Sequence, residues 1–313
     1  MVNNKTAKIK LILDILHDSQ VPVSGEQLAA ALGVSRVAVW KTISGLKDKG
    51  YLIESTHTGY RLISSTDKPV PWEMGAASEL IEYHDELDST MHKASLLIDS
   101  GCRDGTTIIA GSQTKGQNKN GGSWSSPDGG LYLTRIRMRP FPAFYLGLYT
   151  VVMTAAAVKL LRVRYSLDVV IDWPGGIDCG GRKIGGLLAE FQGSRDRVSS
   201  VALGIGLNLN DGETLPDGAV SIDEIINDRI SVKEITAELL AELDRSDRDF
   251  PAVDLTEIFT KYIKQAGKTA AVMKQDGRNL SGTIIELHPS GALVLDTGAC
   301  IEYIFSGDKA QYE

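Results

Sequence analysis

Cysteine is scarce in this chain of 313 residues, which holds only Cys102, Cys179 and Cys300. The three lie far apart and form no CxxC pair, which argues against a zinc cluster and a disulfide scaffold and fits a reducing cytoplasm. The first ten residues alternate polar and basic side chains, with no apolar run behind them. We therefore expect no secretory signal peptide and a cytoplasmic protein.

Long uncharged segments are also rare, and only one raises the question of a membrane span. Residues 140–158 carry no charge, but two prolines, two tyrosines and two threonines dilute their apolar character, and Lys159 and Arg162 follow. A transmembrane helix needs about 20 mostly apolar residues. A buried helix is the favoured interpretation, and we expect no membrane partner.

Basic residues are outnumbered, because 33 Lys and Arg stand against 40 Asp and Glu and give a net charge of −7. With 42% hydrophobic and 23% charged residues the composition is globular, and the length fits two or three domains. Residues 1–66, which we call the head, hold eight basic and five acidic side chains, so the head carries +3 and the rest −10. A basic head on an acidic body points to nucleic-acid binding at the N-terminus.

The head has the local signals of three short helices and a hairpin. Ser24 stands three residues before Gln27, which is the spacing of a capping box, and Gly33 can end that helix with a positive φ. Ser35 can cap a third helix. The patterns predict helices over residues 5–17, 24–33 and 35–50, and strands over residues 51–54 and 60–63.

This order of elements resembles a winged helix-turn-helix, in which the third helix enters the major groove and the wing touches phosphate or the minor groove. The alternative is a small helical domain that docks a protein. The basic excess and the hairpin favour binding to double-stranded operator DNA. The candidate DNA-binding residues lie in the first half of the third helix and at the wing tip: Ser35, Arg36, Val37, Ala38, Lys41, His57 and Thr58.

The composition changes after residue 66, where Pro69 and Pro71 mark a linker. Residues 111–130 contain six glycines and few apolar residues, and a polar loop of this length is usually functional or mobile. The patterns around it predict a helix over residues 91–100, a buried helix ending near 161, and strands over 106–110, 131–137, 169–173, 183–191 and 199–209.

Short motifs follow one another through this central region. In order they are Asp88-Ser89-Thr90, Gln113 with Gly116, Gly121 and Trp124, Ser126-Pro127 with Leu131-Tyr132-Leu133, Trp173-Pro174, Gly181-Arg182-Lys183 with Gly186, and Gly204-Ile205-Gly206-Leu207-Asn208-Leu209-Asn210. Together they resemble the biotin protein ligases, in particular the bifunctional kind whose N-terminal winged helix represses biotin genes. The resemblance covers nearly the whole chain.

The resemblance implies an α+β multidomain fold. It places a winged helix-turn-helix in residues 1–66, an α/β ligase-like domain of the class II synthetase type in residues 67–265, and an SH3-like β-barrel in residues 266–313. A helical pattern at 232–243 precedes the barrel, and residues 258–263 are expected to close the central domain. The short strands of the barrel are expected at 270–274, 282–287, 292–296 and 300–305. His288, beside Pro289, is expected to be a turn residue and not a ligand.

The resemblance also implies a two-step reaction. Biotin carboxylate attacks the α-phosphate of ATP and forms biotinyl-5′-AMP and pyrophosphate, and a lysine of a biotin carboxyl carrier domain then takes the acyl group. ATP, Mg²⁺ and the carrier are needed only by an active enzyme, in which Lys183 and Lys119 would be the catalytic cations. The implied ligand-binding residues are Ser89, Thr90, Gln113, Gly116, Trp124, Lys183, Gly186 and Asn208.

Three of these residues, and the Trp173-Pro174 motif, also have a purely structural interpretation. Ser89 and Thr90 suit the N-cap of a helix. Lys183 alone could be a solvated surface lysine, and Trp173-Pro174 alone would be core packing. No metal ligand is visible at the strand end that carries Trp173-Pro174.

The sequence departs from the family where the nucleotide binds. In the family's GRGRxGRxW loop, Gln117 and Gly122 replace two arginines, and Lys119 replaces the third without its planar two-pronged donor. The family's KWPND strand end has become Asp172-Trp173-Pro174-Gly175-Gly176, so a lysine is now an acid and the asparagine and aspartate are glycines. Met91 and Gly130 replace two further asparagines.

These departures predict weak adenylation, because each lost charge-assisted contact costs about 1.5–3 kcal/mol and about 1.4 kcal/mol is tenfold in rate. We therefore predict a repressor whose ligase-like domain senses biotin or a related small carboxylate, a pseudoenzyme that binds operator DNA as a homodimer. The alternative is an active bifunctional ligase and repressor that biotinylates the carrier. Transfer of another acyl group, such as lipoate, follows from the fold alone.

Overall fold

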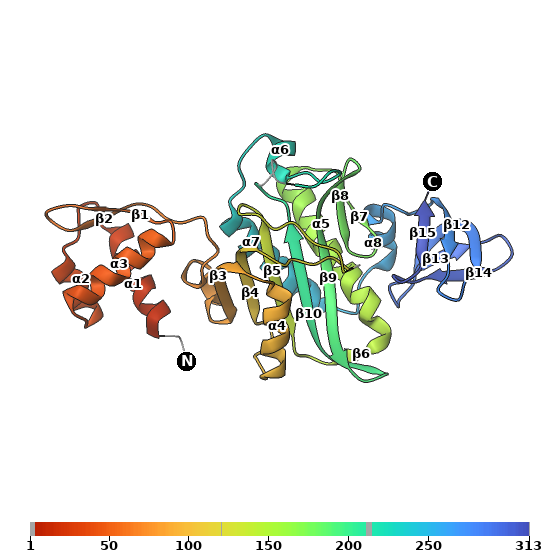
Figure 1. Cartoon of the computed structure of the whole chain (residues 1–313), viewed down its shortest axis with the longest axis horizontal. Coiled ribbons are helices and arrows are strands. Elements are labelled where there is room, and N and C mark those ends of the chain that lie inside the picture. The colour runs from red at the N-terminus through yellow and green to blue at the C-terminus, as the bar shows by residue number, and fades with distance from the viewer. Residues whose placement is uncertain (1–3, 120, 211–214, 313) are drawn as a thin grey trace. The chain divides into compact units, whose positions relative to one another are not determined.

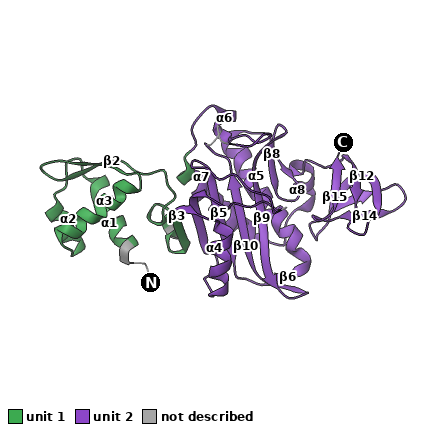
Figure 2. Cartoon of the chain, in the orientation of Figure 1, with its two compact units in different colours: residues 1–83, 231–234 green, residues 84–230, 235–313 purple. Residues whose placement is uncertain are grey.

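The structure is a computed structural model that describes residues 4–119, 121–210 and 215–312 (Figure 1). It divides into two compact units (Figure 2). The first unit contains residues 1–83 and 231–234, and the second contains residues 84–230 and 235–313. The C-terminal strands belong to the second unit, so the domain boundary predicted after residue 265 stays a prediction.

The head forms the predicted helix-turn-helix with a two-stranded wing. Ser24 and Gln27 make the capping box, and Gly33 ends the second helix at φ 63°. The buried core of the head is apolar, with Ile12, Leu28 and Ile43 at its centre. The elements are α1 Asn4–Asp18, α2 Gly25–Leu32, α3 Arg36–Asp48, β1 Leu52–Ser55 and β2 Tyr60–Ser64.

The linker after the wing is fastened to the first turn of α7 (Val232–Asp249) within the first unit. The Asp67 carboxylate accepts hydrogen bonds from Ser231 Oγ at 2.5 Å, from Val232 N at 3.1 Å and from Lys233 N at 3.3 Å. Lys233 Nζ also lies 3.1 Å from a carboxylate oxygen of Glu73. An acid at a helix N-terminus satisfies free N–H groups and suits the helix dipole.

Replacing Asp67 is therefore expected to loosen this attachment. Asp67→Ala should lower the free energy of unfolding by about 1–2 kcal/mol, because it removes the carboxylate that accepts from Val232 N and Lys233 N in the first turn of α7. Urea unfolding followed by circular dichroism measures the change. Asp217→Ala, in a loop, is the matched control and should change the free energy by less than about 0.5 kcal/mol; equal effects of the two variants would contradict the capping role.

A β-sheet forms the centre of the second unit. Its strand order is β3-β4-β5-β10-β9-β8-β7, with β6 paired to β10, and the pairs from β4 to β7 are antiparallel. The strands are β3 Ile81–Leu87, β4 Thr107–Gln113, β5 Leu131–Arg137, β6 Phe141–Pro142, β7 Val169–Asp172, β8 Gly176–Cys179, β9 Arg182–Gly193 and β10 Arg197–Leu207.

The two faces of the sheet are covered by different helices (Figure 1). On one face Ala94 and Ile98 of α4 (Thr90–Asp99) pack on Ile108, Ile136 and Ala202. On the other face lie α5 and α7. There Arg135 and Arg137 of β5 pair with Asp244 and Asp247 of α7. Because side chains alternate along a strand, residues 134 and 204 share the face of α4.

Helix α5 (Leu146–Tyr165) contains residues 146–158 of the uncharged segment. The span Ala143–Tyr165 is long and apolar enough to cross a membrane, but 61% of its most apolar window is buried inside the protein. It packs against β7, β8 and β9. The short helices α6 Ile222–Ile226 and α8 Leu255–Tyr262 complete this part of the unit.

The C-terminal strands form one open sheet of order β14-β13-β12-β11-β15. Among the strands described, no pairing closes this sheet, so the expected SH3-like barrel is not confirmed. Gly291 joins the sheet to α5: its φ is 84°, and a Cβ there would lie 2.2 Å from Leu148 N. His288 lies in the adjoining turn, where its Nδ1 accepts from Ser290 N. The strands are β11 Thr269–Met273, β12 Asn279–Leu287, β13 Leu293–Asp296, β14 Ile301–Ile304 and β15 Lys309–Tyr312.

Candidate functional site

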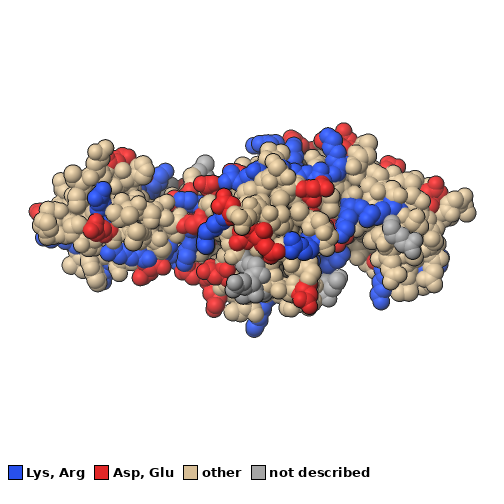
Figure 3. Space-filling model, turned by 90° about the horizontal axis from the view of Figure 1, so that it is seen from above, with Lys and Arg blue, Asp and Glu red and all other residues tan. Residues whose placement is uncertain are grey.

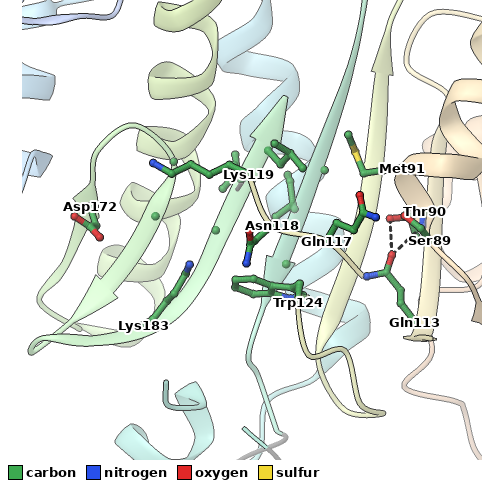
Figure 4. Close-up of a pocket in the computed structure, with 18 of the residues that line it drawn as sticks. Ser89, Thr90, Met91, Gln113, Gln117, Asn118, Lys119, Trp124, Asp172 and Lys183 are labelled. Carbon is green, nitrogen blue, oxygen red and sulfur yellow. Dashed lines mark hydrogen bonds between the residues drawn. The ribbon is translucent and has the colours of Figure 1, made fainter. Parts of the chain in front are cut away.

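A cavity of about 170 Å³ opens beside α4 on the sheet (Figure 4). It brings together seven of the predicted residues: Ser89, Thr90, Gln113, Lys119, Trp124, Lys183 and Gly186. Further residues complete the lining: Met91, Gln117, Asn118, Asp172, Trp173, Gly175, Gly176, Leu187, Leu188, Gly204, Ile205 and Gly206. The sequence prediction missed Leu187 and Leu188 as lining residues, since the same apolar strand pattern would suit a buried core.

The floor of the cavity is made of glycine. In the register of β9 and β10, Gly206 faces Gly186 and Gly204 faces Leu188, so these four residues share the face of α4. A Cβ on Gly206 would lie 2.6 Å from Trp124 Nε1, and one on Gly204 would lie 2.6 Å from Met91 Sδ. Trp124 and Met91 therefore occupy the space that strand side chains would otherwise fill.

One end of the cavity, which we call the neutral end, carries uncharged hydrogen-bonding groups. Thr90 N and Thr90 Oγ1 donate to Gln113 Oε1 at 2.8 and 3.1 Å, and Thr134 Oγ1 donates to Thr90 Oγ1 at 2.9 Å. Gln113 Nε2 donates to Ser126 Oγ at 3.0 Å. Ser89 caps α4 by accepting from His92 N at 3.4 Å. Ser89 is thus the helix cap, whereas Thr90 is held in the hydrogen-bond network of the cavity.

The other end, which we call the charged end, holds two lysines. Figure 4 shows Lys119 and Lys183 on the side of Trp124 away from Thr90 and Gln113. Lys183 Nζ lies 4.9 Å from the centre of the Trp124 ring, a favourable cation–π distance. Burial lowers the pKa of the Lys183 ammonium, with Asp172 opposing and Lys119 adding to that effect. A carboxylate placed between the two lysines would relieve this cost.

Asp172 lines the charged end, but its carboxylate is already bound. Gln265 Nε2 donates to Asp172 Oδ1 at 2.6 Å, and Gln265 Oε1 accepts from Trp173 N at 3.2 Å. Gln265 is buried, with 2% of its surface exposed. The acid that replaces the family's lysine is therefore held by a residue distant in sequence, and no sequence motif signalled that partner.

The backbone after Pro174 leaves no room for side chains. Leu187 N donates to Gly175 O at 2.7 Å, which brings the turn before β8 against β9. A Cβ on Gly175 would lie 2.5 Å from Leu187 O, and one on Gly176 would lie 2.9 Å from Asp172 O. Distances below 3.0 Å to backbone atoms require the chain to shift. The asparagine and aspartate positions of the family motif are thus closed by the main chain.

The polar loop forms a small hairpin over the cavity. Trp124 N donates to Gly116 O at 2.8 Å, and Asn118 N donates to Gly122 O at 2.9 Å. This closure aims the Trp124 ring at the glycine floor, where its buried Nε1 has no hydrogen-bond partner. Gly116 itself lies at the base of the hairpin and outside the lining: a Cβ there would meet Trp124 O at 2.6 Å.

Asn208 also lies outside the lining. Its side-chain amide is buried and donates to the backbone oxygens of Lys183 and Val220, both at 3.3 Å. Asn208 N donates to Ile184 O at 2.9 Å. The residue therefore positions the strand that carries Lys183.

The head presents a second candidate site between α3 and the wing. Arg36, Val37, His57 and Thr58 line a groove of about 530 Å³. Ser35 accepts from Ala38 N at 3.2 Å and so caps α3, and Lys41 is exposed one turn further along. Basic and acidic side chains are interspersed over the face of the molecule seen in Figure 3. Charge alone does not mark a binding surface on that face.

The wing tip is tied back to the body of the head. Val23 and Tyr60 exchange backbone hydrogen bonds of 2.9 and 2.8 Å, and a Cβ on Gly59 would lie 2.1 Å from Val23 O. Only glycine allows this close approach at φ 150°. The tip residues His57 and Thr58 are thus held at a fixed place beside α3.

Comparison with known proteins assigns both parts of the chain that carry the candidate sites to known families. Residues 8–61 match a family described as HTH domain, and residues 85–208 match the biotin/lipoate A/B protein ligase family. Bifunctional ligase/repressor BirA of Bacillus subtilis is 30% identical over 303 residues, covering 91% of this chain and 93% of that protein. The chain belongs to the BirA family of bifunctional ligase/repressors.

Three further proteins are similar to this chain or to part of it. Bifunctional ligase/repressor BirA of Escherichia coli is 26% identical over 98% of both chains. The biotin protein ligase of Aquifex aeolicus in complex with biotin and ATP superimposes with a TM-score of 0.62, at 23% identity, over 74% of this chain and 99% of that one. The head alone is 46% identical over 55 residues to the probable transcription repressor NiaR of Thermotoga maritima, which is 18% of this chain and 31% of that protein.

Proposed function

We propose that this BirA-family protein is an operator-binding repressor whose ligase-like domain senses biotin or a related small carboxylate and has lost most of its adenylation chemistry. The observation that carries the proposal is the contrast between the two ends of the cavity. The neutral end keeps the family's hydrogen-bonding residues in one network, whereas the charged end offers two lysines and a closed main chain at Gly175 and Gly176.

The proposed ligand follows from this division. The Lys119 and Lys183 ammonium groups would hold a carboxylate, Trp124 and the glycine floor would cover an apolar chain, and Thr90 with Gln113 would exchange hydrogen bonds with a neutral polar group. A biotin molecule has these three parts in this order.

A magnesium–triphosphate group does not fit the residues at the charged end. Asp172 is the only carboxylate among the described lining residues, and its Oδ1 already accepts from Gln265. Mg²⁺ needs oxygen ligands in near-octahedral geometry, and a triphosphate beside Asp172 would be repelled. We therefore derive no reaction step through ATP.

The proposed regulation uses the hairpin loop. A bound ligand would stabilise residues 115–130 against the glycine floor, and we propose that this favours a homodimer that binds a palindromic operator in the cytoplasm. The carrier domain would be a partner only of an active enzyme. We further propose that the C-terminal sheet serves as the SH3-like cap of the family.

Isothermal calorimetry with the full chain tests the proposal. Biotin should bind in the absence of ATP, and ATP should give no heat of binding with or without Mg²⁺. Saturable binding of ATP with Mg²⁺ would favour the alternative, an active bifunctional ligase and repressor. No binding of biotin or of biotinyl-5′-AMP would exclude biotin as the effector.

The lowered pKa of Lys183 predicts an alkaline limit to binding. A lysine with a lowered pKa is charged below that pKa and loses its charge at a lower pH than an ordinary lysine does. The affinity for biotin should therefore fall as the pH rises toward the range in which ordinary lysines titrate, because Lys183 loses its charge first. Lys183→Arg should bind with little change over that range, because arginine stays charged. The same pH dependence in both proteins would contradict the role of Lys183.

A further inference from the structure

The surface of α3 that the proposed operator binding would turn toward DNA carries two large apolar side chains that the core of the head does not use. On α3, Val37 is 62% exposed and Trp40 is 59% exposed. They lie three residues apart and so are neighbours on one face of the helix. Both line the groove between α3 and the wing, together with Arg36, His57 and Thr58. We call Val37 and Trp40 the apolar strip.

The position of the strip identifies its partner. Val39, Ile43 and Leu46 form the buried face of α3, so the strip lies on the side turned away from the core. Arg36 precedes the strip and Lys41 follows it on the exposed surface. Cations at both ends of the apolar strip suit a partner whose surface has phosphate groups on either side of an apolar feature. In the major groove of DNA the apolar feature is the 5-methyl group of thymine.

We infer that Trp40, with Val37, reads thymine methyl groups in the operator and so sets sequence specificity. The cations would fix the helix on the phosphates, which carry no sequence information. The indole face and the valine methyls would then pack on thymine methyls and exclude cytosine at those positions. The sequence did not predict Trp40 as a DNA-binding residue, because the exposure of its side chain cannot be read from the sequence.

The test uses the full chain with biotin present, and a duplex selected by the protein from a random-sequence library. The selected duplex is then made again with uracil in place of thymine, which removes only the 5-methyl groups. Wild-type protein should bind the uracil duplex about fourfold more weakly for each methyl it contacts, measured by fluorescence anisotropy. Trp40→Ala should bind the thymine duplex more weakly and show little difference between the two duplexes.

Lys41→Ala is the matched control on the same helix. It removes a charge and should weaken binding to both duplexes alike. The slope of log affinity against log salt concentration should fall by the amount that about one phosphate contact contributes. Trp40→Ala should leave the salt dependence unchanged. Leu11→Ala, an exposed apolar truncation on α1, should change neither affinity nor discrimination.

Four results would overturn the inference. Equal binding of both duplexes by the wild type would show that no methyl group is read. Undiminished discrimination by Trp40→Ala would assign the reading to other residues. A Trp40→Ala protein that binds DNA normally but no longer forms a homodimer would make the strip a protein-docking surface. Failure to select any duplex would contradict DNA binding by the head and, with it, this inference.

Discussion

Carrier biotinylation by the full chain is expected to run about a thousandfold slower than by an ordinary biotin protein ligase, with ATP, Mg²⁺, biotin and a carrier domain supplied. The family's arginines are absent at Gln117 and Gly122, and each lost charge-assisted contact costs about 1.5–3 kcal/mol. The Asp172 carboxylate adds a negative charge to the same end of the cavity. A gel assay of labelled biotin on the carrier measures the rate.

Restoring the strand-end motif alone is expected to fail. The double variant Gly175→Asn/Gly176→Asp would place Cβ atoms 2.5 Å from Leu187 O and 2.9 Å from Asp172 O, so the main chain between β7 and β9 must move. That movement would break the hydrogen bond from Leu187 N to Gly175 O. The variant should therefore unfold at a lower temperature and show no gain in carrier biotinylation.

The hairpin loop over the cavity carries the variant that is matched to the strand-end variant. A Cβ on Gly122 meets only the end of the Asn118 side chain, at 2.9 Å, and that side chain can rotate away. Gln117→Arg/Gly122→Arg should therefore fold normally and raise the rate more than the strand-end variant does. Wild-type activity close to that of an ordinary ligase would contradict the loss of chemistry. Full activity of the strand-end variant would contradict the closed main chain.

The sequence predicted the local parts of this structure well. The helices of the head lie within about two residues of the predicted ranges, because the capping box at Ser24, the glycine at Gly33 and the apolar spacing are all local signals. The family resemblance predicted Ser89, Thr90 and Gln113 as ligand-binding residues, and the structure brings them together in the lining of one cavity. The structure adds that Ser89 is the helix cap and that Asn208 lies behind the cavity.

Long-range pairing accounts for what the sequence could not predict. Strand β8 was missed because two of its four residues, Gly176 and Asp178, have low strand propensity, and it exists through pairing with β7 and β9. The bond between Asp172 and Gln265 joins residues that are 93 positions apart. The expected barrel also depends on closure between distant strands, and the described sheet is open.

The second large effect is expected from a substitution in the glycine floor of the cavity. Gly206→Val is expected to abolish detectable biotin binding in calorimetry, because its Cβ would lie 2.6 Å from Trp124 Nε1 and 3.0 Å from Trp124 Cζ2. The indole ring must then leave the floor and enter the space that the apolar chain of the ligand would occupy. Lys183 would lose its cation–π partner at the same time.

Two measurements separate a blocked cavity from a damaged fold. Ser199→Val introduces the same side chain at an exposed position of the same strand and should bind biotin like the wild type. The thermal unfolding temperature of Gly206→Val should fall by only a few degrees, because valine suits a strand and the hairpin that carries Trp124 can move. If Gly206→Val keeps wild-type affinity for biotin, the ligand does not lie on the glycine floor, and the site must be placed elsewhere in the domain.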